Sequence, residues 1–329
     1  MNSNFLIALP FLAFFGALMF LLPQFSPRRF FFAITVPAGF RSSAEARAIA
    51  RRYHRWMAIA LFCGVALVAV AAPEVPDWAV ILAVFLPMIA GFILFLMGRS
   101  QVRHYAAAPN DVREAELTAE GDQVPRWALW ALPPFAAPLA TAQYLHQHWN
   151  QIPARFPAHL DLQGNVNGWS ARTPQGVYGV LAGAAGIMVL LLLVGIGLYY
   201  GSRRAPQRAA VLKMLICTMY YLALLFAWIG LMPLLQISVV WLLISSVAFS
   251  VGIVVWSFKL VTDPRMPAEA TPDDCWYLGG IYCNRHDPAI FVQKRIGFGY
   301  TLNLGNRVTW LLMGGLLAGI FGVMAVVKL

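Results

Sequence analysis

The stretch VYGVLAGAAGIMVLLLLVGIGLYY, Val177–Tyr200, is an apolar run without a single charged residue. About 20 such residues in a helix cross the hydrocarbon core of a bilayer. Comparable runs recur along the chain, since 60% of its 329 residues are hydrophobic and only 12% are charged. A soluble protein with helices this apolar would need charged outer faces, which these segments lack. The sequence therefore predicts an integral membrane protein.

Eight apolar runs predict transmembrane helices. They are Phe5–Leu22, Trp56–Ala72, Trp78–Gly98, Trp127–Leu145, Val177–Tyr200, Met214–Leu235, Ile237–Phe258 and Val308–Val327. The predicted fold class is an all-α polytopic membrane protein of about eight spans, with a small β-hairpin-like cytoplasmic segment before the last helix. It divides into five parts: 1–126 with basic cytoplasmic loops, a helix pair 127–200, a helix pair 201–261, the hairpin-like domain 262–307 and the last helix 308–329.

The basic residues predict the orientation of these spans. With the N-terminus outside, all but three of the 24 Lys and Arg fall in loops on the inner side. The three exceptions are Arg155, Arg172 and Lys328. Such an excess is typical of cytoplasmic loops, so we expect a multi-pass protein of the bacterial plasma (inner) membrane with both termini outside. No single soluble part carries the net charge of +10, which argues against nucleic-acid binding.

A polar segment, QIPARFPAHLDLQGNVNGWSARTP at 151–174, then faces outward. Prolines stiffen its ends and glycines beside asparagines favour turns, which is typical of an ordered loop. Its side chains either converge on a ligand or satisfy the loop's own backbone, and the sequence leaves both alternatives open. The candidate ligand-binding residues are His159, Asp161, Asn165, Asn167, Trp169 and Arg172.

A second polar segment, Asp273–Asn306, consists of short apolar and aromatic runs and predicts a hairpin-like unit on the inner side. Cys275 and Cys283 lie too far apart in sequence for a short zinc knuckle. We therefore expect reduced thiols, no metal site and no cofactor.

The predicted spans contain no Asp, Glu, Lys or Arg, whereas proton pumps and ion-coupled transporters usually need buried ionisable groups. The chain also lacks a zinc-protease helix, a nucleophile elbow and a phosphate-binding loop. We therefore expect no enzymatic activity. The alternatives are a permease of a small solute, with a polar cavity around Tyr220, Tyr221, Ser245 and Ser246, or an uncharacterised membrane enzyme.

Both polar segments resemble parts of SdpI-like bacterial membrane proteins. The outer loop is similar to a domain of unknown function found in that group, which includes immunity and signalling proteins that act against a secreted toxic peptide. The residues that carry this resemblance are Pro153, Arg155, Pro157, His159, Gly164, Gly168 and Trp169. The pattern FFAITVPAGF, with Val36 and Pro37, resembles an inner loop of related proteins.

The segment Asp273–Asn306 is similar to a second uncharacterised domain that often follows the first. Its candidate motif residues are Trp276, Tyr282, Asn284, Asp287, Lys294, Arg295 and Asn303. The resemblance implies a non-enzymatic sensor or immunity protein whose outer loop recognises a peptide or envelope ligand. The implied partners are the lipid bilayer, a secreted peptide and a cytoplasmic regulator.

Overall fold

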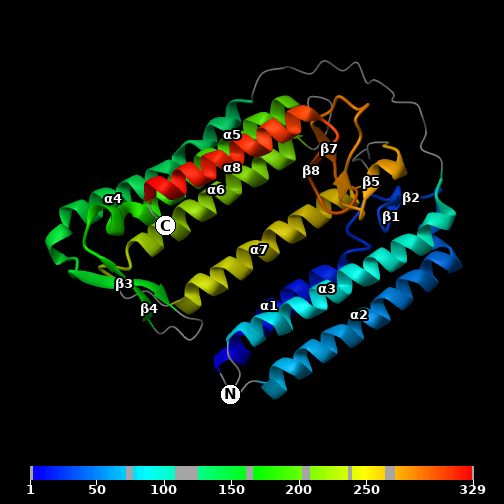
Figure 1. Ribbon diagram of the computed structural model, residues 1–329, viewed down its shortest axis with the longest axis horizontal. Coiled ribbons are helices and arrows are strands. Elements are labelled where there is room, and N and C mark those ends of the chain that lie inside the picture. The colour runs from blue at the N-terminus through cyan, green and yellow to red at the C-terminus, as the bar shows by residue number, and fades with distance from the viewer. Residues whose placement is uncertain are drawn as a thin grey trace. The chain divides into compact units, whose positions relative to one another are not determined.

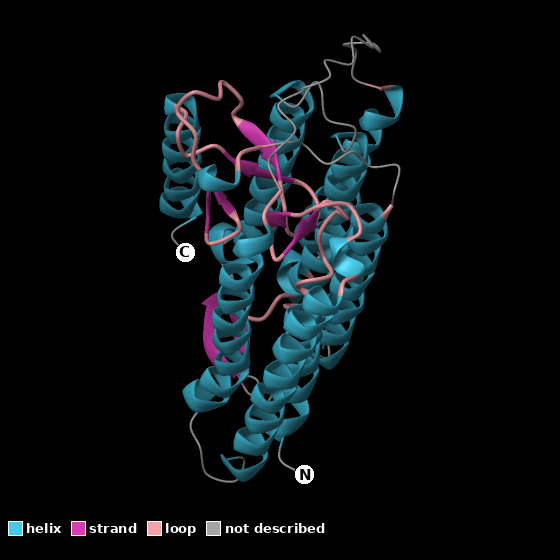
Figure 2. Cartoon of the chain, turned by 90° about the vertical axis from the view of Figure 1, so that its right-hand side faces the viewer, coloured by secondary structure: helices cyan, strands magenta, loops and turns pink. Residues whose placement is uncertain are grey.

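The computed structural model describes residues 3–71, 77–107, 125–160, 166–201, 208–235, 239–263 and 271–327. The chain is mostly helical, with short two-stranded antiparallel hairpins between the helices (Figures 1 and 2). It divides into two compact units. Unit 1 comprises Met1–Leu117 and Ser250–Asn306, and unit 2 comprises Thr118–Phe249 and Arg307–Leu329.

Unit 1 is built on three helices that pack against one another: α1 (Ser3–Leu21), α2 (Ala44–Ala71) and α3 (Asp77–Val102). Its core lies at the end of these helices where α1 leads into α2 and where α3 ends. The second part of α7 (Val239–Thr262) also belongs to this unit.

The described residues of unit 1 also form three small hairpins. They pair β1 (Phe30–Phe31) with β2 (Ile34–Thr35), β5 (Trp276–Tyr277) with β6 (Ile281–Tyr282), and β7 (Phe291–Gln293) with β8 (Tyr300–Leu302). The last two lie in residues 271–306, which we call the pre-α8 segment. The predicted hairpin-like unit before the last helix is therefore confirmed.

Unit 2 contains α4 (Ala136–Gln147), α5 (Pro174–Gly201), α6 (Arg208–Gly230), α8 (Arg307–Val327) and the first part of α7. Helix α5 packs against α4, α6 and α8. Between α4 and α5 lies a hairpin of β3 (Arg155–Leu160) and β4 (Val166–Ala171).

Four helices of the described residues are long and apolar enough to cross a membrane. They cover Val84–Tyr105, Pro174–Tyr199, Arg208–Gly230 and Val240–Thr262. Two further apolar stretches, Leu9–Leu21 and Arg307–Gly322, are shorter. The prediction of eight transmembrane helices is therefore not supported, although the membrane class of the chain is.

The predicted fourth span, Trp127–Leu145, is broken up. The chain forms 3₁₀ turns at Arg126–Ala131 and Pro133–Phe135 before α4, which has only 12 residues. A helix of that length rises about 18 Å, well short of a hydrocarbon core of about 30 Å. Pro133 and Pro134 explain the break, because proline donates no backbone hydrogen bond and so removes two bonds from an α-helical ladder.

The predicted second span is only the later part of α2. This helix has 28 residues, and its first half carries Arg47, Arg51, Arg52 and Arg55. Its apolar half exposes large side chains, including Phe62 at 75%. An exposed apolar face of this kind is expected where a helix contacts lipid.

Candidate functional site

The turn between β1 and β2 is formed by two buried residues with positive φ, Phe32 (47°) and Ala33 (59°). Positive φ at both central residues of a two-residue loop suits the twist of a hairpin, but glycine and asparagine usually supply it. Packing holds the turn in place. The Phe32 ring lies against Tyr53 and Phe95, and a Cβ added at Gly98 would overlap that ring.

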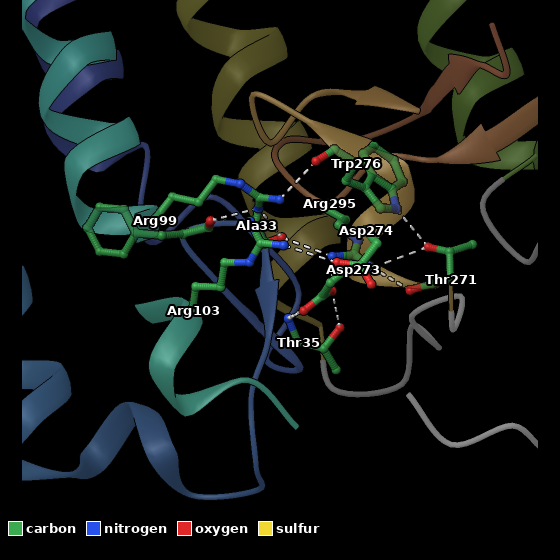
Figure 3. Close-up of polar contacts among 10 residues, drawn as sticks. Ala33, Thr35, Arg99, Arg103, Thr271, Asp273, Asp274, Trp276 and Arg295 are labelled. Atoms are coloured by element: carbon green, nitrogen blue, oxygen red, sulfur yellow. Dashed lines mark hydrogen bonds and ion pairs between the residues drawn. The ribbon is translucent and has the colours of Figure 1, made fainter. Parts of the chain in front are cut away.

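Arg295 is buried, with an exposure of 1%. Its guanidinium carbon is 4.9 Å from the centroid of the Phe30 ring and 5.0 Å from that of Trp276, so the group lies near the faces of both rings. It donates hydrogen bonds to the Ala33 carbonyl at 3.0 Å, to the carboxylate of Asp273 and to the carbonyl of Thr271 (Figure 3). Arg295 therefore joins the pre-α8 segment to the β1–β2 hairpin.

Asp273 also joins the pre-α8 segment to the β1–β2 hairpin. Its carboxylate accepts hydrogen bonds from the Thr35 amide (3.2 Å) and the Thr35 hydroxyl (2.8 Å), in addition to Arg295. Arg99 of α3 donates to the Ala33 carbonyl at 2.7 Å and to the Trp276 carbonyl at 3.0 Å (Figure 3). Three segments far apart in the sequence thus share one polar network, which we call the arginine cluster.

Burial dominates the electrostatics of this cluster. It lowers the pKa of the Arg295 guanidinium, and the charge and hydrogen bond of Asp273 act in the opposite direction. Arg41, which donates to the carbonyls of Ser26 and Phe30, has its pKa lowered to about 10 by burial and by Arg28. The arginines act here as donors to backbone carbonyls, which is a structural role.

A second network surrounds Asn303, which is fully buried. Its amide nitrogen donates to the carbonyls of Asn284, Asp287 and Ala289, and its oxygen accepts from the amides of Asn284 and Gly305. The Tyr282 hydroxyl donates to the Asp287 carboxylate at 2.9 Å. Most of the predicted motif residues of the pre-α8 segment are therefore engaged with one another.

Lys294 differs from the other motif residues because it is exposed. Cys275 and Cys283 are half-buried, and the Cys283 amide donates to the Cys275 carbonyl at 2.9 Å. In the described part of the chain, no group of three or more His, Cys, Asp or Glu side chains could hold a metal ion.

The β3–β4 hairpin is anchored at its base. Phe156 and Ile152 are buried with Leu145, Val177 and Leu181 in one apolar cluster. Arg172, predicted as a ligand-binding residue, donates to the carbonyls of Ile152 (2.9 Å) and Asn150 (3.4 Å). The structure therefore places Arg172 as a support of the hairpin base.

Several side chains of the hairpin beyond its base are exposed. His159, Asn167 and Trp169 are all accessible, and Trp169 is 61% exposed. His159 pairs with Gly168 across the strands, and a Cβ at Gly168 would crowd the His159 ring. Asp161 and Asn165 lie outside the described residues.

Tyr221 and Ser246, two residues of the polar cavity expected for a permease, form a hydrogen bond with each other in unit 2. The Tyr221 hydroxyl and the Ser246 hydroxyl lie 2.7 Å apart, and the Tyr221 ring stacks on Phe249 with centroids at 4.1 Å. Ser245 and Ser246 each also donate to the Leu242 carbonyl. Their polar groups are used within the helix pair α6–α7.

Sequence reasoning missed the partners of the motif residues. It singled out Arg295, but not Asp273, Thr35 or Arg99, and it did not predict the β1–β2 turn. The only sequence signal was the pattern FFAITVP itself, because its aromatic residues and Ile34 are unusually apolar for a loop between helices.

Comparison with known proteins gives one match. A model of a family of unknown function (DUF5808) matches residues 285–310, which include Asp287, Lys294, Arg295 and Asn303. No curated protein and no solved structure matches the chain. The family match covers an uncharacterised domain at the predicted place and does not extend to the outer-loop motif, on which the resemblance to SdpI-like proteins rests.

Proposed function

We propose that this chain is a non-enzymatic, multi-pass protein of the bacterial plasma membrane, an SdpI-like sensor or immunity protein whose β3–β4 hairpin recognises a peptide or envelope ligand. The observation that carries the proposal is the contrast within the hairpin. Its base is fixed in an apolar cluster, whereas His159, Asn167 and Trp169 are exposed. Large aromatic side chains held on a rigid element are frequent anchors of recognition.

The hairpin also offers backbone groups to an extended ligand. In the described residues its sheet has two strands, so β3 and β4 each have one edge without a neighbouring strand. A peptide can pair with such an edge while side-chain contacts supply specificity. Trp169 and Asn167 on β4 could supply these side-chain contacts, because both side chains are exposed on the strand that carries that edge.

The distribution of Lys and Arg along the sequence supports placing the hairpin outside and the arginine cluster inside. Unit 1 is consistent with this orientation. Its basic residues Arg41, Arg99, Arg103 and Arg295 lie in segments that meet at one end of α1, α2 and α3 (Figure 1). In this proposal the inner network anchors the protein or relays a response to a cytoplasmic regulator.

The proposal assigns no catalysis, because the titratable side chains of the arginine cluster are bound to one another and to backbone carbonyls. The alternative function, a permease of a small solute, would require polar side chains that line a pathway for the solute. Solute accumulation against a gradient by purified protein in liposomes would favour the permease. A hydrolytic activity lost on a single substitution would favour an enzyme.

The test of recognition is a gene deletion complemented with variants and challenged with secreted peptides and envelope stresses. Trp169→Ala and His159→Ala should abolish protection or signalling while protein level and thermal stability in detergent stay near wild type. Trp241→Ala is the matched control, because Trp241 on α7 is 60% exposed, close to the 61% of Trp169. Full protection by both hairpin variants, or loss of folded protein in step with loss of the phenotype, would refute the proposal.

A further inference from the structure

A cavity of about 400 Å³ opens in unit 2 between the 3₁₀ turn Arg126–Ala131 and the first part of α6. Its lining residues are Trp127, Trp130, Lys213 and Ile216. Ile216 is buried, Trp127 is half-buried and Trp130 is 61% exposed. The cavity is thus mainly apolar and aromatic, with one cationic side chain.

The cation is held beside an aromatic ring. The Lys213 ammonium lies 5.3 Å from the centroid of the Trp127 ring, which is within the range of a cation–π contact. Lys213 is exposed, so its ammonium remains available to a further partner. Tryptophan beside a basic residue is characteristic of the membrane–water interface.

The described residues of unit 2 carry no Asp or Glu side chain. The acidic residues of unit 2 are Glu120 and Asp122, before Trp127, and Asp161, between β3 and β4, and all three lie outside the described residues. Arg126 adjoins Trp127 in the sequence, and Arg208 begins α6. The 28 residues of α5 separate the hairpin from this end of the unit by about 40 Å of helix. The described residues of unit 2 therefore offer no carboxylate partner to Lys213.

We propose that this cavity binds an anionic glycerophospholipid of the leaflet beside the basic loops. Its phosphate lies at Lys213, and its glycerol and upper acyl chain lie against Trp127, Trp130 and Ile216. The apolar lining favours a lipid over a free phosphate ion, and basic pockets between membrane helices are suited to anionic headgroups. The inference rests on the membrane placement proposed above, but not on recognition by the hairpin.

The test uses the full-length chain, purified in detergent and mixed with equal amounts of phosphatidylglycerol and phosphatidylcholine, with bound lipids counted by native mass spectrometry. Wild-type protein should retain phosphatidylglycerol preferentially. Lys213→Gln should reduce that preference about fivefold, as expected for the loss of one basic contact near a membrane surface. Lys259→Gln is the control, because Lys259 is also an exposed lysine near the end of an apolar helix. It should leave the preference unchanged.

Equal preference in wild-type and Lys213→Gln protein would overturn the proposal, as would an equal reduction in Lys259→Gln, which would indicate general surface charge. A parallel sample with inorganic phosphate added to the lipid mixture distinguishes the sources. Displacement of phosphatidylglycerol by millimolar phosphate would show a free-anion site instead. Thermal unfolding of each variant checks folding, and the outcome is independent of the Trp169→Ala phenotype.

Discussion

Arg295 donates a 3.0 Å hydrogen bond to the carbonyl oxygen of Ala33, a residue 262 positions earlier in the chain. Both residues are buried, and Ala33 has a positive φ that an alanine rarely adopts. The strained turn is therefore held by a segment from the other end of the sequence. This contact makes the N-terminal hairpin and the pre-α8 segment one structural body.

The first prediction concerns the ion pair between Arg295 and Asp273. Arg295→Met should lower the free energy of unfolding by about 3–5 kcal/mol, because it leaves the Asp273 carboxylate without its cation and removes a donor from the carbonyls of Ala33 and Thr271. Thermal and denaturant unfolding in detergent measures the change. Lys294→Met is the control, since the adjacent lysine is exposed, and should shift the stability by less than about 0.5 kcal/mol.

A double variant separates charge from packing at this pair. Adding Asp273→Leu to Arg295→Met should recover part of the lost stability, because the uncompensated carboxylate is then gone. Stability of the single Arg295→Met variant equal to that of wild type would show that the cluster does not hold the hairpin.

The second prediction concerns the contact between Gly98 and Phe32. Gly98→Ala should destabilise the protein by about 1–3 kcal/mol, because the new methyl group overlaps a fully buried ring. Gly252→Ala in α7 should be tolerated, since nothing lies within 4 Å of the added Cβ. Combining Gly98→Ala with Phe32→Leu should cost less than the sum of the two single changes. Strict additivity in this double-mutant cycle would contradict the contact.

The third prediction is a pH dependence at Cys275. Burial, followed by the negative charge of Asp274, raises the pKa of this thiol above its ordinary value. The unreactive thiol form therefore persists to higher pH, and the rate of maleimide labelling should rise only at more alkaline pH than for a free thiol.

This dependence is measured in membranes of a variant with Cys63, Cys217 and Cys283 replaced by serine. Asp274→Asn should speed labelling at a given pH, because it removes a charge that opposes the thiolate. Glu45→Gln, a change at an exposed carboxylate, should have no effect. A labelling profile that Asp274→Asn leaves unchanged would contradict the assigned cause.

The apolar helices were predictable because hydrophobic length alone identifies them. Pro174–Tyr199, Arg208–Gly230 and Val240–Thr262 overlap the predicted spans Val177–Tyr200, Met214–Leu235 and Ile237–Phe258, with ends that differ by up to six residues. The prediction of a transmembrane helix at Trp127–Leu145 was wrong because the run is apolar but contains Pro133 and Pro134. Those prolines were a readable signal that the helix does not continue through the run.

The arginine cluster could not be predicted in the same way. An arginine in a loop is normally solvated, and its burial depends on partners that the sequence places far away, here Asp273, Phe30 and Trp276. In the segment 151–174, turns were predicted but strands were not. Proline is disfavoured inside strands, yet Pro157 lies in β3 opposite Trp169, next to an irregularity in the pairing.

In the proposed orientation the β3–β4 hairpin faces outward and the pre-α8 segment faces inward. Labelling of spheroplasts with a membrane-impermeant maleimide tests it in two proteins that lack Cys63 and Cys217. One keeps Cys275 and Cys283, and the other replaces both with serine and carries Trp169→Cys. The account predicts that the Trp169→Cys protein is labelled in intact spheroplasts and that the Cys275 and Cys283 protein is labelled only after lysis. Labelling of Cys275 or Cys283 before lysis, or protection of the Trp169→Cys thiol until lysis, would contradict it.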